Sequence, residues 1–449
     1  MSNSFEREKT PKAGAVLPDS ALKPPGEIAP AAAEQSTLGG MLRPFRVRNF
    51  SLLFGGQTIS TIGDALYAVA LPWLILNNGG NAQELGIVLT AYGIPRVGCV
   101  LLGGWLSDHL RPRRLMLIAD GARAVLVGLL TALTLWGHPG LWALCAIAVP
   151  LGAFEGFFLP AQSAILPDIL NNDDLQAGNG VSFASTQGAT LVGSAVAGIV
   201  VATLTSGTAL ALDALTFVVS ALSLAMMRVA KLSIHDQPEE AGNDESSSTV
   251  EAGRETAISF GRFLRTSRLI QASILVCIAA NFCFGGLMEV VLPALVHGQM
   301  NGGASGYGLM LAAFGGGALG GGLVAGALGK VKRKGLVALL VALVMAIVIA
   351  LIPYGGVAAA AICMLIAGLS NSITNVLLLT VIQLVIPRHL MGRIMGLLLF
   401  ASFGTYPISV ALSGVLTNHF GPVILFPVSG LMLGLAILFG MTQKELREL

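Results

Sequence analysis

The chain has 449 residues, of which 54% are hydrophobic and only 11% are charged. Because soluble domains carry about 25% charged residues, this composition excludes an ordinary water-soluble protein. It predicts an all-α polytopic membrane protein that crosses the bilayer many times. The net charge of +2 gives no indication of nucleic-acid binding, and we expect none.

The N-terminal segment is rich in proline, alanine and charge, and it contains no apolar run of the kind found in signal peptides. We expect a disordered tail over residues 1–44. Six apolar runs follow, each long enough for a membrane helix, which needs about 20 residues. They cover residues 51–76, 84–106, 114–136, 141–164, 177–204 and 208–228.

A polar, acidic, serine-rich stretch from His235 to Glu255 follows these runs and predicts a linker. Six further apolar runs cover residues 269–296, 305–328, 335–353, 357–385, 391–416 and 421–441. The sequence therefore predicts twelve transmembrane helices in two six-helix bundles. The predicted domains are a tail (1–44), an N-terminal bundle (45–230), a cytoplasmic linker (231–265), a C-terminal bundle (266–442) and a C-terminal tail (443–449).

Outside the apolar runs, lysine and arginine occur only in every second connection and at the chain ends. Those next to the runs include Arg43, Arg46, Arg48, Arg111, Arg113, Arg114, Arg228, Lys231, Lys330, Lys332, Arg333, Lys334, Arg388, Arg393, Lys444 and Arg447. The alternate connections, such as 77–84, 137–140 and 297–306, contain neither residue. Because basic loops stay on the cytoplasmic side, both termini are predicted to be cytoplasmic.

The two groups of six runs resemble each other. The stretch after the second run, "GGWLSDHLRPRRLM", is weakly similar to the stretch after the eighth run, "GGGLVAGALGKVKRKGLV". In the same way, Pro167 of the first group corresponds to Pro387 of the second. Two halves of the same topology predict a parallel repeat about an axis along the membrane normal. A substrate would then bind between the halves near the middle of the bilayer.

The connection after the second run is densely polar. It suggests a latch, by which we mean ion pairs at one membrane face that hold the two bundles together until they are released. We expect Gly104 to allow close helix approach, and Asp108 to face an arginine or the N-terminus of a helix. We expect Arg113 and Arg114 to pair with Glu155, placed near the cytoplasmic end of the fourth run. The alternative is that the arginines only set the orientation of the chain in the membrane.

This loop, with its Gly-x-x-x-Asp and paired arginines, resembles the signature loop of the major facilitator superfamily. The stretches "RNFSLLFGGQTISTIGDALYAVALPWLIL", "FFLPAQSAILPDIL" and "LALDALTFVVSAL" are similar to its bacterial enterobactin-exporter and macrolide-efflux-like branch. The resemblance implies a transporter of the bacterial inner (plasma) membrane that exports drug-like or siderophore-like molecules. His109, Pro112 and Ser194 depart from the family pattern, and Ser194 weakens the expectation of antiport.

Ionisable residues inside predicted spans point to function, because each costs about 2.5–3.5 kcal/mol at the middle of the bilayer. Asp64 and Glu289 are candidate proton carriers, with Arg123 as a candidate coupling partner. The alternative for Asp64 is a static ion pair with Arg96 or Arg123. Glu289 is expected to lie close to the outer interface, which makes it the second choice.

Two other carboxylates have structural interpretations. Asp120 and Arg123 are three residues apart, which places them on one helix face as a structural pair. Asp213 is expected to cap the N-terminus of the sixth helix near the outer surface.

Polar residues of other kinds could orient a ligand in a central cavity or bond neighbouring helices. These candidates are Arg96, Asn281, Asn371, Asn375 and Gln383. The five cysteines lie in apolar runs without metal-ligand spacing, so we expect no metal site. No cofactor and no enzymatic activity are expected, because the sequence lacks a P-loop, a His-Glu-x-x-His motif and a Gly-x-Ser-x-Gly motif.

The sequence as a whole favours a monomeric secondary active transporter that exports small amphipathic organic molecules in exchange for protons. An importer or facilitator with the same fold, or a membrane sensor that does not transport, is the alternative, because direction is not set by the fold.

Overall fold

The computed structural model describes residues 42–228, 268–328, 331, 333–386 and 391–443, and its regular elements are helices throughout. The first half contains α2 (Arg48–Asn77), α3 (Ala82–His109), α4 (Pro112–Trp136), α5 (Leu141–Ile169), α6 (Asn172–Thr203) and α7 (Ser206–Met226). The second half contains α9 (Arg268–Gly286), α10 (Leu292–Gly298), α11 (Gly303–Ala327), α12 (Lys334–Leu351), α13 (Gly356–Val385), α14 (Met391–Phe420) and α15 (Pro422–Thr442).

The twelve predicted membrane spans are confirmed. Twelve helical segments of the described chain are long and apolar enough to cross a membrane. The seventh of these is composite, because α9 continues through a π-helical turn, η2 (Leu287–Val291), into α10. The largest differences in boundary are at the fourth and fifth spans: α5 runs on to Ile169 and α6 already begins at Asn172.

Several sequence predictions fall on parts of the chain outside the described residues. They include the linker 231–265, most of both tails, and the basic residues Lys231, Lys330, Lys332, Arg388, Lys444 and Arg447. At the edge of the predicted N-terminal tail, Arg43–Arg46 forms a 3-10 helix, η1, that contacts α2 and α6.

Local sequence explains where several helices begin. The Asn81 side chain accepts hydrogen bonds from the backbone N–H groups of Gln83 (2.9 Å) and Glu84 (3.0 Å), which caps α3. Pro112 starts α4, where its missing N–H costs nothing. Gly421 adopts a φ of 77° between α14 and α15, a value that favours glycine.

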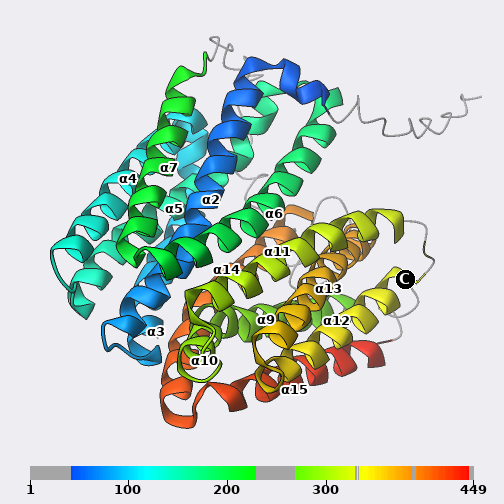
Figure 1. Cartoon of the computed structure of the whole chain (residues 1–449). Coiled ribbons are helices and arrows are strands. Elements are labelled where there is room, and N and C mark those ends of the chain that lie inside the picture. The colour runs from blue at the N-terminus through cyan, green and yellow to red at the C-terminus, as the bar shows by residue number, and fades with distance from the viewer. Residues whose placement is uncertain (1–41, 229–267, 329–330, 332, 387–390, 444–449) are drawn as a thin grey trace, which may run out of the picture.

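The helices form two bundles, α2–α7 and α9–α15, which lie side by side (Figure 1). The bundles meet mainly where α3 packs on α14 and where α6 packs on α11. In span numbering these are the second with the eleventh and the fifth with the eighth, so each contact is the repeat image of the other. This symmetry is the one expected of a parallel six-plus-six repeat.

Glycine allows close contact at both crossings. A Cβ atom at Gly86 of α3 would lie 2.8 Å from the carbonyl oxygen of Val410 in α14. A Cβ atom at Gly308 of α11 would lie 2.5 Å from the carbonyl oxygen of Ser194 in α6. Any larger residue would push the two backbones apart at these points.

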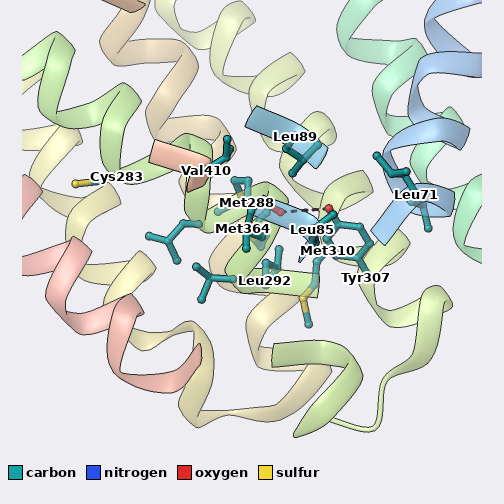
Figure 2. Close-up of a cluster of buried hydrophobic side chains, with 14 of the residues drawn as sticks. Leu71, Leu85, Leu89, Cys283, Met288, Leu292, Tyr307, Met310, Met364 and Val410 are labelled. Carbon is teal, nitrogen blue, oxygen red and sulfur yellow. Dashed lines mark hydrogen bonds between the residues drawn. The ribbon is translucent and has the colours of Figure 1, made fainter. Parts of the chain in front are cut away.

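A buried hydrophobic cluster continues across both bundles. It includes Leu85 and Leu89 of α3 together with Met288, Leu292 and Met310 of the second half (Figure 2). Within it, the hydroxyl of buried Tyr307 donates a hydrogen bond to the carbonyl oxygen of Met288 in η2 at 3.2 Å, drawn as a dashed line in Figure 2.

The two ends of the double bundle differ. We define the basic end as the one with the arginine-rich α3–α4 connection, and the opposite end as the one with the α2–α3 connection. At the opposite end Trp73 of α2 stacks on Tyr307 of α11, with ring centroids 5.6 Å apart. Nearby, His297 Nε2 lies 3.0 Å from Asn77 Oδ1, another contact between the halves. Side chains of the two halves therefore contact each other at the opposite end.

Candidate functional site

A cavity of about 230 Å³ lies between the two halves, at the level of the middle of the helices. Its lining combines charged groups with aromatic rings, and α2, α3, α4, α5 and α7 face η2 and α14 across it. The lining residues are Asp64, Tyr67, Ala68, Leu71, Pro72, Leu89, Tyr92, Arg96, Arg123, Val127, Leu151, Glu155, Asp213, Phe217, Glu289 and Tyr406.

An ion pair between Asp64 and Arg123 forms the centre of the cavity. Arg123 Nη2 donates to Asp64 Oδ1 at 2.7 Å, and the Arg123 guanidinium lies 4.0 Å from the centroid of the Phe217 ring. The side chain of Arg123 is only 6% exposed, whereas that of Asp64 is 46% exposed. The arginine is thus fixed by its surroundings, and the carboxylate is the partner that a ligand can reach.

A second ion pair, between Arg96 and Glu155, lies beside the first. Arg96 Nη2 is 3.0 Å from Glu155 Oε1, and Arg123 Nη2 is 3.7 Å from Glu155 Oε2. The Tyr92 hydroxyl also donates to Glu155 Oε2. Glu155 therefore connects the two arginines.

Asp120 lies behind this layer and is fully buried. It accepts a hydrogen bond from Ser220 Oγ at 2.6 Å, and its other oxygen is 3.8 Å from Arg123 Nη1. The predicted Asp120–Arg123 proximity is present, and Asp120 positions Arg123 from the side away from the cavity.

The second half contributes one carboxylate, Glu289, from the π-helical turn η2. It lines the cavity and accepts a hydrogen bond from the Tyr406 hydroxyl of α14. The expectation that Glu289 lies close to the outer interface is wrong, because it lines the central cavity together with Asp64. A π-turn leaves one residue out of the usual helical register, which is a common way of placing a side chain at a functional site.

Asp213 was expected to cap the sixth helix, and this expectation is wrong. The N-cap of α7 is Thr205, whose hydroxyl accepts from the Thr208 N–H at 3.1 Å. Asp213 lies seven residues after Ser206, so it is about 10 Å further along the helix and reaches the cavity wall. Its Oδ2 is buried and has no hydrogen-bond partner within the described part of the chain.

The expected pairing of Glu155 with Arg113 and Arg114 is also wrong. Glu155 bonds Arg96 instead, because α5 extends to Ile169 and places Glu155 about 20 Å from that end of the helix. Arg113 donates to the carbonyl oxygens of Leu224 and Ala225, both at 2.7 Å, and so joins α4 to the end of α7. Arg114 is exposed.

Gly104 and Asp108 lie in the last two turns of α3. Their part in a latch stays a prediction. Of the four amides, Asn281, Asn371 and Asn375 line a separate cavity of about 90 Å³ inside the second half, and Gln383 is exposed. Of the predicted cavity-lining polar residues, the central cavity therefore contains only Arg96.

The aromatic residues of the site were not predicted from the sequence; they are Tyr67, Tyr92, Phe217 and Tyr406. Three of these are tyrosines, whose hydroxyl needs a partner inside a membrane, and that need was the available signal. Within the described residues, no group of three or more His, Cys, Asp and Glu side chains has a metal-site arrangement.

Counting charges over the cavity lining gives four carboxyl groups and two guanidinium groups. In a medium of low polarity, an uncompensated pair of negative charges is costly. Protons or a cationic ligand would compensate the excess.

Comparison with known proteins identifies the family. Residues 53–405 match the model of the Major Facilitator Superfamily. The chain belongs to this superfamily of membrane transporters. Because the match covers well over half of the chain, the resemblance to this superfamily noted in the sequence is confirmed.

Curated relatives include export proteins. The chain is 26% identical to the multidrug efflux pump Tap of Mycobacterium tuberculosis (strain H37Rv) over 418 residues, covering 89% of this chain and 94% of Tap. It is 25% identical over 405 residues to the enterobactin exporter EntS of Salmonella typhimurium, covering 89% and 93%. Among solved structures, a D-xylose-proton symporter superposes with a TM-score of 0.67 at 14% identity over 90% of this chain and 97% of the other. The fold and these relatives are those of transporters.

Proposed function

We propose that this transporter exports small amphipathic organic molecules across the bacterial inner (plasma) membrane in exchange for protons. The observation that carries the proposal is the excess of two carboxyl groups over guanidinium groups in a cavity between the two halves. An exchanger needs groups that hold either a proton or a cationic substrate. A carboxylate in a membrane cavity can do both.

The aromatic lining supports an amphipathic substrate. Tyr67, Tyr92 and Tyr406 present rings beside the carboxylates, and a ring face attracts an organic cation while its edge contacts apolar parts of the ligand. The similarity to Tap and EntS supports export of organic molecules, since both relatives are named as exporters.

We assign the exchangeable proton first to Asp64, because it is the half-exposed member of its ion pair. Glu289 is the second carrier, from the other half. Arg123 would hold Asp64 in its ionised form until substrate or proton replaces that contact. Each half would then contribute one carboxylate, Asp64 or Glu289, whose charge changes when a proton or a substrate binds in the cavity.

The orientation is part of the proposal. If the basic end is cytoplasmic, as the distribution of Lys and Arg predicts, the opposite end, where Trp73 stacks on Tyr307, faces outward. The described conformation would then be the one closed to the outside, in which a substrate approaches from the cytoplasm. We further propose that the transporter acts as a monomer, because the cavity lies within one chain.

Efflux of ethidium, an amphipathic organic cation, from loaded cells tests the proposal. We expect the wild type to extrude the dye, and we expect both a protonophore and the change Asp64→Asn to abolish extrusion. Asp168→Asn is the matched control, since Asp168 is an exposed carboxylate of α5 that does not line the cavity. Efflux that survives both the protonophore and Asp64→Asn would show a facilitator instead.

A further inference from the structure

A second cavity, of about 290 Å³, lies in the first half between α2, α5 and α6. We call it the vestibule. Its α2 residues run from Phe50 to Thr61, on the side of Asp64 that leads to the basic end. It is therefore nearer the basic end than the central cavity.

The vestibule is polar but contains no charge. Nine of its fourteen lining residues carry a hydroxyl or an amide, and none of the fourteen is ionisable. Uncharged polar groups inside a membrane helix normally turn inward and bond one another. Here several of them do bond one another, as Thr58 and Ser185 do at 2.6 Å, but together they also line an open space, which suits a polar ligand or water.

The amides of the vestibule are held in place by a chain of hydrogen bonds. Gln162 Nε2 donates to Gln57 Oε1 at 3.0 Å, and Gln57 Nε2 donates to Ser220 Oγ at 3.2 Å. Ser220 in turn donates to the fully buried Asp120. This chain fixes the positions of both glutamines, so the wall is preformed before any ligand arrives.

Aromatic rings complete the wall. Phe54 makes a T-shaped contact with Phe45, with the two ring centroids 4.8 Å apart. Phe183 of α6 is 49% exposed and borders the vestibule. Amides and hydroxyls that both donate and accept, next to aromatic faces, match a ring that carries hydroxyl groups. An ion would find no opposite charge here.

We infer that the vestibule is a second binding site, specific for an uncharged, hydroxyl-bearing ring such as a sugar unit. Small-molecule pockets measure about 300–1,000 Å³, so a cavity of about 290 Å³ accommodates a single ring rather than a whole drug. The site is distinct from the central cavity in chemistry, and it does not depend on proton exchange.

Protection from alkylation tests the inference on the full chain in lipid nanodiscs. Thr186→Cys places a thiol on the vestibule wall, and mass spectrometry follows its alkylation apart from the five native cysteines. The probe is phenyl β-D-glucopyranoside. We expect alkylation at position 186 to slow about tenfold when the probe exceeds its Kd tenfold. Ser182→Cys replaces this variant if it does not fold.

Three controls make the result decisive. Thr380→Cys in α13, whose hydroxyl bonds its own helix as that of Thr186 does, should show no protection. Phenyl phosphate, which is charged, should not protect position 186. Gln162→Met should weaken protection about threefold to tenfold, as expected for one lost hydrogen bond.

The inference is overturned if the glucoside gives no protection up to its solubility limit, or protects Thr380→Cys equally. It is also overturned if Gln162→Met leaves protection unchanged. Ethidium efflux is measured separately, so a failure of this site and a failure of proton-driven export are distinguishable.

Discussion

The two halves share one topology but differ in chemistry. The first half supplies five of the six charged residues that line the central cavity, and the second half supplies only Glu289. Both halves pack through the same pair of glycine-containing crossings. The repeat therefore determines how the halves meet, while the ionic network belongs to one copy and the other copy presents a single carboxylate to it.

This asymmetry suggests how the halves are coupled. Arg96 of the first half lies 5.5 Å from the ring centroid of Phe403 in the second half, close to the interface. Glu289 faces the same cavity from the other side. A change in the charge of Glu289, or of the charged residues of the first half, would alter the electrostatic energy of the other side, because few other charges are present to screen it.

The largest effect is expected from removing the cation at the centre of the first half. Arg123→Met leaves Asp64 and buried Asp120 without their shared partner. Breaking a buried ion pair costs about 3–5 kcal/mol, so the unfolding temperature in detergent should fall clearly. Adding Asp64→Asn should restore part of the loss.

Arg114→Met is the control for this variant, because Arg114 is exposed. If Arg123→Met unfolds at the same temperature as Arg114→Met, the first half does not depend on its ionic network.

A smaller effect is expected from the two tyrosine–carboxylate contacts, one on each side of the cavity. Tyr406→Phe removes the hydroxyl that donates to Glu289, and Tyr92→Phe removes one donor to Glu155, which keeps Arg96. A hydrogen bond to a charged group contributes about 1.5–3 kcal/mol, so Tyr406→Phe should lower the ethidium efflux rate by about tenfold to a hundredfold. Tyr92→Phe should lower it less.

Initial efflux rates at equal expression provide the comparison. If Tyr92→Phe lowers the efflux rate more than Tyr406→Phe does, then Glu289 of the second half contributes less to transport than its position in the cavity suggests.

The smallest effect is expected at the basic end of the first half. Arg113→Met removes two hydrogen bonds to the carbonyl oxygens of Leu224 and Ala225, at a partly exposed position. We expect a loss of about 1 kcal/mol in stability and nearly normal efflux. A strong loss of efflux without loss of stability would instead restore Arg113 to the latch predicted from the sequence.

The fold was predictable because a membrane imposes both a length and a composition on each span. Asp64, Arg96, Arg123 and Glu289 were recognised because ionisable residues inside spans are costly. The pairing of Asp64 with Arg123 was one of the alternatives considered, but the pairing of Arg96 with Glu155 was not recognised, since the depth of a residue depends on where its helix ends. Extending α5 by five residues beyond the predicted end at residue 164 moved Glu155 away from the basic end.

Aromatic and amide residues of the site were harder to recognise. Phe217 facing a cavity and a phenylalanine facing lipid look alike in sequence, and the direction of each is set by the packing of neighbouring helices. Gln57 and Gln162 come together from α2 and α5, which are far apart in the chain. No local pattern records such a pairing.

The glycines at the crossings influence how fast the halves can separate and rejoin. At Gly86 and Gly308 the backbone of one half contacts the backbone of the other half directly. No side chain therefore has to be immobilised at these points when the halves come together. Immobilising a flexible side chain costs about 0.5–1.5 kcal/mol, and these two contacts avoid that cost. The entropic cost of bringing the halves together at these two points is correspondingly low.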